Sequence, residues 1–185
     1  MSNGKLFVIS GASGVGKSTV LAKVMAGRTD LCFSVSATTR PPRPGETEAE
    51  SYYFVSKACF QEMIQKDAFL EYDNHMGNFY GTPKAQLEEK LQKGNVILDI
   101  EPNGAFHVRQ ARPDSVLLFI APPSLEELER RLRSRGDTSE EQIRLRLDRA
   151  AWETEQGKQY DYLVFNNRVE DCAEEILQII QKETK

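Results

Sequence analysis

The segment GASGVGKS, Gly11–Ser18, constrains this chain more than any other feature, because it fits the pattern GxxxxGK followed by Ser or Thr. A short apolar run, Leu6–Ile9, precedes it, and apolar residues recur at helical spacing from Val20 to Met25. A strand, a glycine-rich loop and a helix in this order gather backbone N–H groups at a helix N-terminus, where they wrap phosphates. The segment therefore predicts a nucleotide-binding P-loop.

Two side chains of the loop have expected roles. Lys17 is expected to reach the β- and γ-phosphates, and the Ser18 hydroxyl is expected to bind Mg²⁺. An ordinary glycine turn before a helix is the alternative, and the agreement of strand, loop, lysine, serine and helix argues against it. The motif alone does not separate a kinase from an ATPase, a GTPase or a transport motor.

Short apolar runs alternate with amphipathic segments along most of the chain. Further buried strands are predicted at Val96–Ile100, Ser115–Ile120 and Tyr162–Phe165. Three helices are predicted. The first covers 84–93, the second begins with a capping box formed by Ser124 and Glu127, and the third follows an apolar stripe from Val169 to Ile180. This alternation predicts an α/β fold with a central parallel sheet flanked by helices.

The middle of the chain, about 32–82, breaks this alternation with Thr-, Ser- and Pro-rich sequence, several tyrosines and a short helical pattern at 57–66. We expect an inserted, mostly β subdomain there. The 185 residues suit a single domain. Its expected core comprises 1–31, 83–125 and 155–185, and a helical lid is expected at about 126–154.

Composition excludes some classes of partner. The chain has 24 Lys and Arg against 28 Asp and Glu, a net charge of −4, whereas nucleic-acid-binding domains are usually basic. It has no apolar stretch long enough to cross a bilayer. Cys32, Cys59 and Cys172 are widely spaced, which indicates reduced thiols. We expect a soluble cytoplasmic protein without nucleic-acid or membrane partners.

Two arginines stand three residues apart in SATTRPPRPGE, Ser36–Glu46. Prolines between and after Arg40 and Arg43 restrict the backbone, so the segment has little freedom to lose on binding. The planar guanidinium suits phosphate. We interpret the segment as a preformed anion clamp; a polar surface loop is the alternative.

Two further clusters carry polar groups that suit a nucleotide. In the segment 71–82, the turn at Tyr80–Thr82 offers two hydroxyls, and Glu71 can accept two donors, as a guanine edge requires. Core packing is the alternative role for Tyr80 and for Tyr52. Seven arginines fall between 130 and 149 around the helix-breaking sequence at 135–137. They predict a helical hairpin that acts as a lid over phosphates, or a surface of salt bridges.

These segments together resemble the guanylate kinase family almost from end to end. The resemblance is carried by GASGVGKST, FSVSATTRPPRPGE, FLEYDNHMGNFYGT, VILDI, APPSLEELERRLRSRG and YDYLVFNN. It implies the reaction ATP + GMP ⇌ ADP + GDP with Mg²⁺, in which a GMP phosphate oxygen attacks directly and no protein nucleophile is needed. It also implies a monomer or homodimer.

The resemblance implies a role for each matching position. ATP would be bound by Gly11, Ala12, Ser13, Gly14, Val15, Gly16, Lys17, Ser18, Thr19, Arg131, Arg135 and Asn166, the last near the adenine. GMP would be bound by Ser36, Arg40, Arg43, Tyr52, Glu71, Tyr80, Thr82, Asp99, Glu101 and Arg146. The catalytic residues would be Lys17, Arg40, Arg131, Arg135 and Arg146. The metal would be bound by Ser18 and Asp99.

The chain departs from the family pattern at several positions. The family usually has glycine in place of Ala49 and aspartate in place of Ser51. Glu101 replaces the second aspartate of the strand motif, and Asn167–Arg168 replaces an Asp-Asp pair near the adenine. We expect altered efficiency from these changes rather than a new reaction.

Two other functions are compatible with parts of this pattern. A non-enzymatic guanylate-kinase-like module would bind phosphorylated peptides, but Lys17 and Ser18 of the ATP side are intact. A relative that phosphorylates another acceptor, such as ribose 1,5-bisphosphate, would not need Ser36, Glu71 and Thr82 together. Their joint presence favours GMP.

Overall fold

The computed structural model describes residues 4–75, 77–134 and 139–185. They group into two compact units. The first unit contains the start of the first strand, Asp30–Asp99 and Asn103–Ser115. The second unit contains Phe7–Thr29, Ile100–Pro102 and Val116–Lys185. The P-loop lies in the second unit, and the arginine segment with its neighbouring tyrosines lies in the first.

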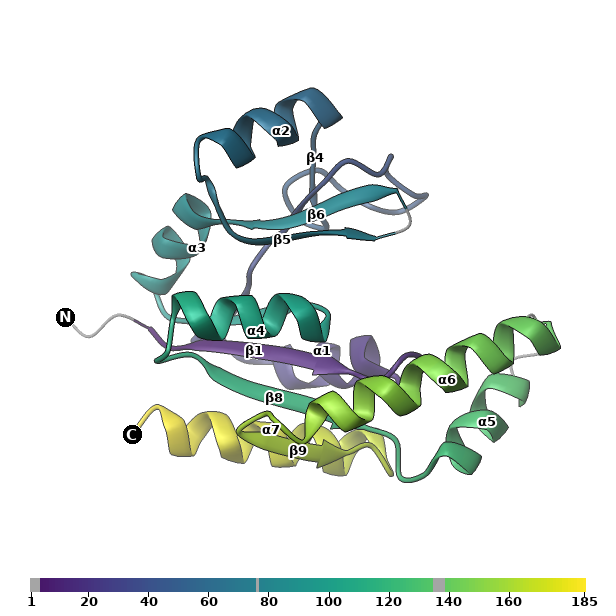
Figure 1. The fold of residues 1–185 in the computed structure, drawn as a ribbon. Coiled ribbons are helices and arrows are strands. Elements are labelled where there is room, and N and C mark those ends of the chain that lie inside the picture. Colours follow the sequence, from purple (N-terminus) through teal and green to yellow (C-terminus); the bar gives the residue numbers. More distant parts are fainter. Residues whose placement is uncertain (1–3, 76, 135–138) are drawn as a thin grey trace. The chain divides into compact units, whose positions relative to one another are not determined.

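The described residues form a five-stranded sheet with the order β2-β7-β1-β8-β9, of which Figure 1 labels β1, β8 and β9. Its strands are β1 (Leu6–Gly11), β2 (Leu31–Phe33), β7 (Asn95–Asp99), β8 (Val116–Ala121) and β9 (Tyr162–Phe165). The pairs β2–β7, β1–β8 and β8–β9 are parallel. The central strands are almost wholly buried, as strands covered on both faces must be. The predicted α/β architecture is confirmed.

Four helices belong to the second unit. They are α1 (Lys17–Met25), α5 (Leu125–Ser134), α6 (Glu140–Gly157) and α7 (Val169–Glu183). Helix α1 packs against α7, and α5 lies beside α6 (Figure 1). The end of α6 packs on β8, where a Cβ added to Gly157 would lie 2.5 Å from Cδ1 of Phe119. This close approach fixes the second half of α6 against the sheet.

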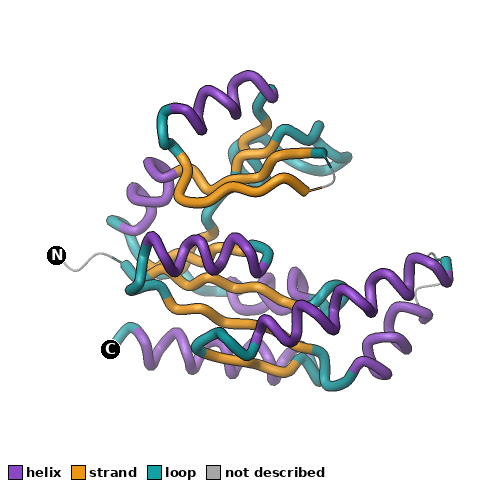
Figure 2. The backbone as a smooth tube through the Cα atoms, viewed as in Figure 1, coloured by secondary structure: helices purple, strands orange, loops and turns teal. Residues whose placement is uncertain are grey.

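The first unit contains a smaller sheet with the order β4-β3-β6-β5, shown in orange in Figure 2. Its strands are β3 (Ala37–Thr38), β4 (Tyr53–Phe54), β5 (Phe69–His75) and β6 (Asn78–Pro83). Helix α2 (Lys57–Gln65) supplies Phe60, whose ring stacks on Phe69 and Phe79 at centroid distances of 4.4 and 5.4 Å. This aromatic core lies within the segment predicted as a mostly β insertion, although Cys32 and Phe33 of that segment belong to β2; the insertion's bounds stay a prediction.

Two further helices, α3 (Lys84–Leu91) and α4 (Pro102–Ala111), complete the described elements. Most strand and helix predictions agree with the structure to within one or two residues. Half of the predicted capping box is present: the Glu127 N–H donates to Ser124 Oγ at 3.1 Å, whereas the Glu127 carboxylate pairs with Arg130 and Arg131. Strand β2 and helix α4 were not predicted, because β2 has only three residues and α4 carries a glycine, Gly104, in its first turn.

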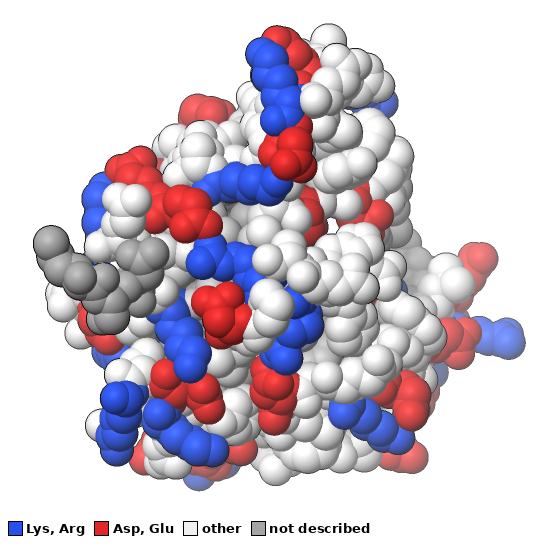
Figure 3. Space-filling model, turned by 60° about the vertical axis from the view of Figure 1, so that its left-hand side comes forward, with Lys and Arg blue, Asp and Glu red and all other residues white. Residues whose placement is uncertain are grey.

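Two surface properties bear on the expected partners. Among the described residues, no helix is long and apolar enough to cross a membrane. Basic and acidic side chains are interspersed over the face shown in Figure 3. That mixture agrees with the small net charge of −4.

Candidate active site

The P-loop connects the end of β1 to α1, as predicted. Gly14 and Gly16 have φ angles of 81° and 91°, a region that side chains rarely adopt. A Cβ would also lie 2.9 Å from Leu132 Cδ2 at Gly14 and 3.2 Å from Asn166 Nδ2 at Gly16. The backbone conformation therefore favours glycine at these two positions, and the neighbouring side chains would have to shift to admit a Cβ.

A pocket of about 330 Å³ opens at this loop. It is lined by Gly11–Thr19, together with Glu101, Arg149 and Glu153. All the predicted phosphate-binding residues of the loop therefore line one pocket. The first turn of α1 points its N–H groups there, and Lys17 adds a positive charge, so the pocket is suited to an anion. The Ser18 side chain is exposed in the same turn.

Arg149 and Glu153 line the pocket but were not predicted as site residues. Glu153 is 1% exposed and accepts hydrogen bonds from the Ser13 N–H at 2.7 Å and from Arg149 Nε at 2.8 Å. Burial raises the pKa of Glu153, and the bonds from Arg149 and Ser13 oppose that rise. The sequence shows this pair only as an i, i+4 spacing, which is common on solvated helix faces.

Glu101, predicted at the guanine edge, lies in the same pocket. Its Oε2 accepts from Arg149 Nη2 at 2.8 Å. The side chains of Arg149 and Glu101 are 37% and 53% exposed, so water screens this ion pair. A contact between Glu101 and guanine stays a prediction.

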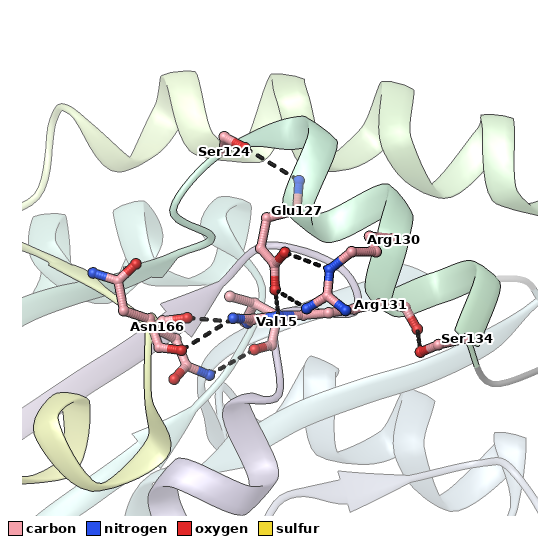
Figure 4. A network of polar contacts seen from close by, with 8 residues as sticks. Val15, Ser124, Glu127, Arg130, Arg131, Ser134 and Asn166 are labelled. Carbon is pink, nitrogen blue, oxygen red and sulfur yellow. Dashed lines mark hydrogen bonds and ion pairs between the residues drawn. The ribbon is translucent and has the colours of Figure 1, made fainter.

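A second network joins α5 and the end of β9 to the P-loop (Figure 4). Arg131 Nε donates to Glu127 at 2.8 Å, and its Nη1 and Nη2 donate to the backbone oxygens of Asn166 and Asn167 at 3.0 and 3.1 Å. Asn166 Nδ2 donates to Val15 O at 2.8 Å. The buried Oδ1 of Asn166 has no partner among the described residues. Asn166 therefore contacts the P-loop and Arg131 is bonded to Asn166, while their roles in ATP binding stay predictions.

The other arginines of the predicted lid differ in their surroundings. Arg130 pairs with Glu127, and Arg133 pairs with Glu129 and Glu140, which confirms the salt-bridged surface for these two. Arg146 is exposed on α6. Arg135 lies outside the described residues.

In the first unit, Arg40 is held by Glu46, a residue for which the sequence predicted no role. Arg40 Nη1 and Nη2 donate to the two Glu46 oxygens at 3.0 and 2.8 Å, and the Arg43 N–H donates to Oε2 at 2.7 Å. The hydrogen bond to Glu46 raises the pKa of Arg40 above its usual range. The clamp is thus ordered by a carboxylate as well as by prolines.

Aromatic side chains surround the same arginine. The Arg40 guanidinium lies 5.5 Å from the ring centroid of Tyr52, and the rings of Tyr52 and Tyr80 are 6.1 Å apart. Burial raises the pKa of Tyr52, with smaller contributions from Tyr80 and from the exposed Asp99 at the end of β7. Arg40, Tyr52 and Tyr80 therefore form one cluster, which we call the clamp cluster. The Arg43 side chain is exposed.

The loop between the clamp and Tyr52 carries two of the departures from the family pattern. Ala49 has a φ of 63°, a conformation that glycine adopts without strain and that costs other residues about 1–2 kcal/mol. This explains why glycine suits that position. Ser51 Oγ still accepts from the Thr47 N–H at 3.1 Å, a bond that an aspartate could also form.

Glu71 and Thr82 face each other across β5 and β6. They are a register pair, and Thr82 Oγ1 donates to Glu71 Oε1 at 2.5 Å. Both are buried, at 7% and 0% exposure. Burial raises the pKa of Glu71, and the Thr82 hydroxyl opposes that rise. Ser36 is half-buried and directly precedes the Ala37–Gly81 pair, so the strand pairing brings the three predicted guanine residues to neighbouring positions.

Comparison with known sequences gives a consistent result. A family profile described as guanylate kinase matches residues 3–183. The guanylate kinase of Thermus thermophilus is 48% identical over 183 residues, which cover 98% of this chain and 83% of that protein. The guanylate kinase of Prochlorococcus marinus is 47% identical over 176 residues, or 95% of each chain.

A solved structure is similar as well. The crystal structure of guanylate kinase from Anaplasma phagocytophilum matches with a TM-score of 0.78 at 35% identity. The match covers 98% of this chain and 87% of that one. Similarity therefore extends across both units and includes every segment that carries a predicted site residue.

Proposed function

Because the chain belongs to the guanylate kinase family, we propose that its two compact units divide the substrates between them. The chain is a nucleoside monophosphate kinase that transfers the γ-phosphoryl group of ATP to GMP, giving ADP and GDP. In the proposal ATP binds at the P-loop of the second unit. GMP binds in the first unit, within a subdomain at about 32–82. A lid at about 126–154 covers the phosphates of the bound nucleotides, and the remaining residues form the core.

Binding of ATP follows from the lining of the P-loop pocket. Backbone N–H groups of the loop and of the start of α1 would donate to the phosphates, and Lys17 would neutralise their charge. Asn166 Oδ1, buried without a partner among the described residues, can accept from the exocyclic amine of adenine. Arg131 holds Asn166 by its backbone oxygen at 3.0 Å and supplies positive charge, together with Arg135 and Arg146 of the lid.

The observation that carries GMP as the acceptor is the buried pair of Glu71 and Thr82. A carboxylate in this site accepts from two adjacent donors, which guanine offers at N1 and N2 and adenine does not. Glu71 would accept the guanine donors beside the Thr82 hydroxyl, and Ser36 adds a further hydroxyl. The clamp cluster and Arg43 would hold the GMP phosphate, whose oxygen attacks ATP directly.

Mg²⁺ would enter this site with ATP. Among the described residues, no group of three His, Cys, Asp or Glu side chains could hold a metal by itself. That agrees with an ion that takes most of its ligands from phosphates and water. The Ser18 hydroxyl and the Asp99 carboxylate are exposed oxygen donors of the kind Mg²⁺ prefers. When bound, the ion neutralises phosphate charge.

The proposed partners are ATP and GMP as small molecules, without nucleic acid or membrane. We also propose a cytoplasmic enzyme that acts as a monomer or homodimer. Support comes from the family's nucleotide substrates and from Cys32, Cys59 and Cys172, which carry free thiols.

A coupled assay of ADP release tests the proposed function. The enzyme is given ATP with Mg²⁺ and one of GMP, dGMP, AMP, UMP, CMP or ribose 1,5-bisphosphate. Turnover with GMP and silence with AMP are expected. Silence with GMP combined with activity on the sugar phosphate would contradict the guanine site and leave the P-loop assignment standing.

Replacement of Arg40 by alanine is expected to raise the KM for GMP about 100-fold, because a charge-assisted contact to its phosphate is lost. The KM for ATP should change by no more than about twofold. Initial rates with either substrate varied measure both values. Lys66→Ala, which removes an exposed cation of the same unit, is the matched control. Equal losses for both substrates would contradict the clamp role.

The affinity for GMP should depend on pH through Glu71. Its carboxylate form accepts the guanine donors, and burial raises the pKa of Glu71 above the usual value of 4.5. Acidification should therefore protonate Glu71 and raise the KM for GMP at a pH where an exposed glutamate is still ionised. The GMP phosphate titrates near pH 6, so the profile is compared with that of Glu71→Gln. Identical profiles would exclude Glu71 as the titrating group.

A further inference from the structure

Of the arginines that the structure describes, Arg149 alone lines the P-loop pocket. It projects from α6 and has carboxylates on two sides, from Glu153 and Glu101. Neither its position nor these contacts have a part in the ATP and GMP sites proposed so far. A role for Arg149 toward a nucleotide rests on the proposed binding of ATP in that pocket.

Glu153 fixes the orientation of the guanidinium. It is almost fully buried, it binds Arg149 through Nε at 2.8 Å, and its other oxygen is bound to the Ser13 N–H at 2.7 Å. Movement of this buried carboxylate would break the hydrogen bonds of both its oxygens, so its position is fixed. Because Nε is bonded to Glu153, the two terminal nitrogens of Arg149 are the part of the guanidinium that can bind other acceptors. Arg149 lines the P-loop pocket.

Glu101 occupies only part of that fork. It accepts from Nη2 at 2.8 Å, and Nη1 has no acceptor among the described residues. Both side chains are more than one third exposed, so the ion pair is weak. A polyphosphate presents more charge and more oxygens than one carboxylate and suits the planar fork. The nucleotide can therefore replace Glu101 without disturbing the contact to Glu153.

We propose that Arg149 is a further catalytic residue, which passes from Glu101 to the polyphosphate of ATP when the nucleotide binds. Glu153 is a positioning residue that aligns Arg149 and the P-loop backbone at Ser13 together. Glu101 is a competing anion that holds the fork in the enzyme without ATP. The P-loop pocket thus contains an arginine for phosphate in addition to Lys17.

Kinetics of Arg149 variants provide the first test. Arg149→Ala should lower kcat/KM for ATP about 100-fold, as removal of one preorganised donor does, with the KM for GMP unchanged. Arg149→Lys should recover part of the loss, because it restores charge without the fork. Arg144→Ala, an exposed arginine on the same helix, is the matched control. Equal rates for Arg149→Ala and Arg144→Ala would overturn the proposal.

Glu101→Gln tests the exchange without removing the arginine. Binding of Mg²⁺ with adenylyl imidodiphosphate, measured by calorimetry, should become tighter by about 1.5- to 5-fold, because the weak ion pair no longer competes. In the Arg149→Ala background the same substitution should have no effect. A purely structural role of Arg149 predicts no such coupling, and unchanged or weaker binding by Glu101→Gln would overturn the exchange.

These results are separable from those that bear on the proposed function. If the wild type phosphorylates GMP and Arg149→Ala does so equally well, only the role of Arg149 fails. If the wild type is silent with GMP but the calorimetric coupling is present, the acceptor assignment fails and the role of Arg149 at the triphosphate stands. A rise in the KM for GMP alone, on replacement of Glu101, would place that carboxylate at the guanine edge instead.

Discussion

Lys17→Ala is expected to lower kcat for phosphoryl transfer by at least about 10²- to 10³-fold while the protein remains folded. Lys17 begins α1 at the pocket, where helix N–H groups and the lysine charge act on the same phosphates. In phosphoryl transfer the protein contributes positioning and electrostatic stabilisation rather than covalent chemistry. Loss of this charge therefore acts on the transition state directly.

The effect is measured by ADP release at saturating ATP and GMP, and folding by circular dichroism and a denaturation midpoint. Lys23→Ala is the matched control, since Lys23 lies on the same helix and forms an exposed ion pair with Glu170 at 3.5 Å. It should change turnover by about twofold at most. Near-wild-type turnover of folded Lys17→Ala would refute the P-loop assignment.

Glu71→Gln is expected to raise the KM for GMP about 100-fold and to leave the KM for ATP unchanged. The amide keeps the shape of the side chain and can still accept from Thr82. Its NH₂ group, however, is a donor placed opposite a guanine donor. The side chain is 7% exposed, so water cannot easily reach the unpaired donors. The ratio of AMP to GMP turnover should rise, because adenine offers one donor and one acceptor.

The acceptor panel measured on this variant and on wild type gives both values. Glu62→Gln serves as the control, because Glu62 lies on α2 of the same unit with an exposed ion pair to Lys66. A Glu71→Gln enzyme with unaltered GMP kinetics would show that guanine is recognised elsewhere.

The two variants, Lys17→Ala and Glu71→Gln, probe the P-loop and the β5–β6 pair. The sequence predicted the first of these parts more completely than the second. The P-loop follows from consecutive residues: the apolar strand, the glycines and the helix are adjacent in the chain. The same holds for the N-cap contact between Ser124 and Glu127 and for the apolar runs of β7, β8 and β9. Each of these depends on backbone preferences and on interactions within a few residues, so local sequence contains the information.

The sequence indicated Glu71 and Thr82 as suitable polar groups, but it did not predict that they contact each other. Their contact depends on the register of β5 against β6, and a shift by one residue would turn one of the two side chains to the opposite face. Similarly, Arg40 and Arg43 were evident as a clamp, but the role of Glu46 was not. A glutamate six residues from an arginine can equally remain in water, and only the folded turn brings it back.

The sequence alone determined the phosphate-binding loop, the order of strands and helices, and the residue types at the proposed ATP and GMP sites. Only the tertiary structure decided that Glu153 would be buried against Ser13, 140 positions away in sequence, and that Arg149 would turn toward the P-loop with Glu101. Helix α6 gives no sequence signal for this, since Leu145 and Trp152 are exposed while Glu153 is buried. The packing of Gly157 on Phe119 sets which face of α6 meets the loop, and such long-range packing is absent from any local pattern.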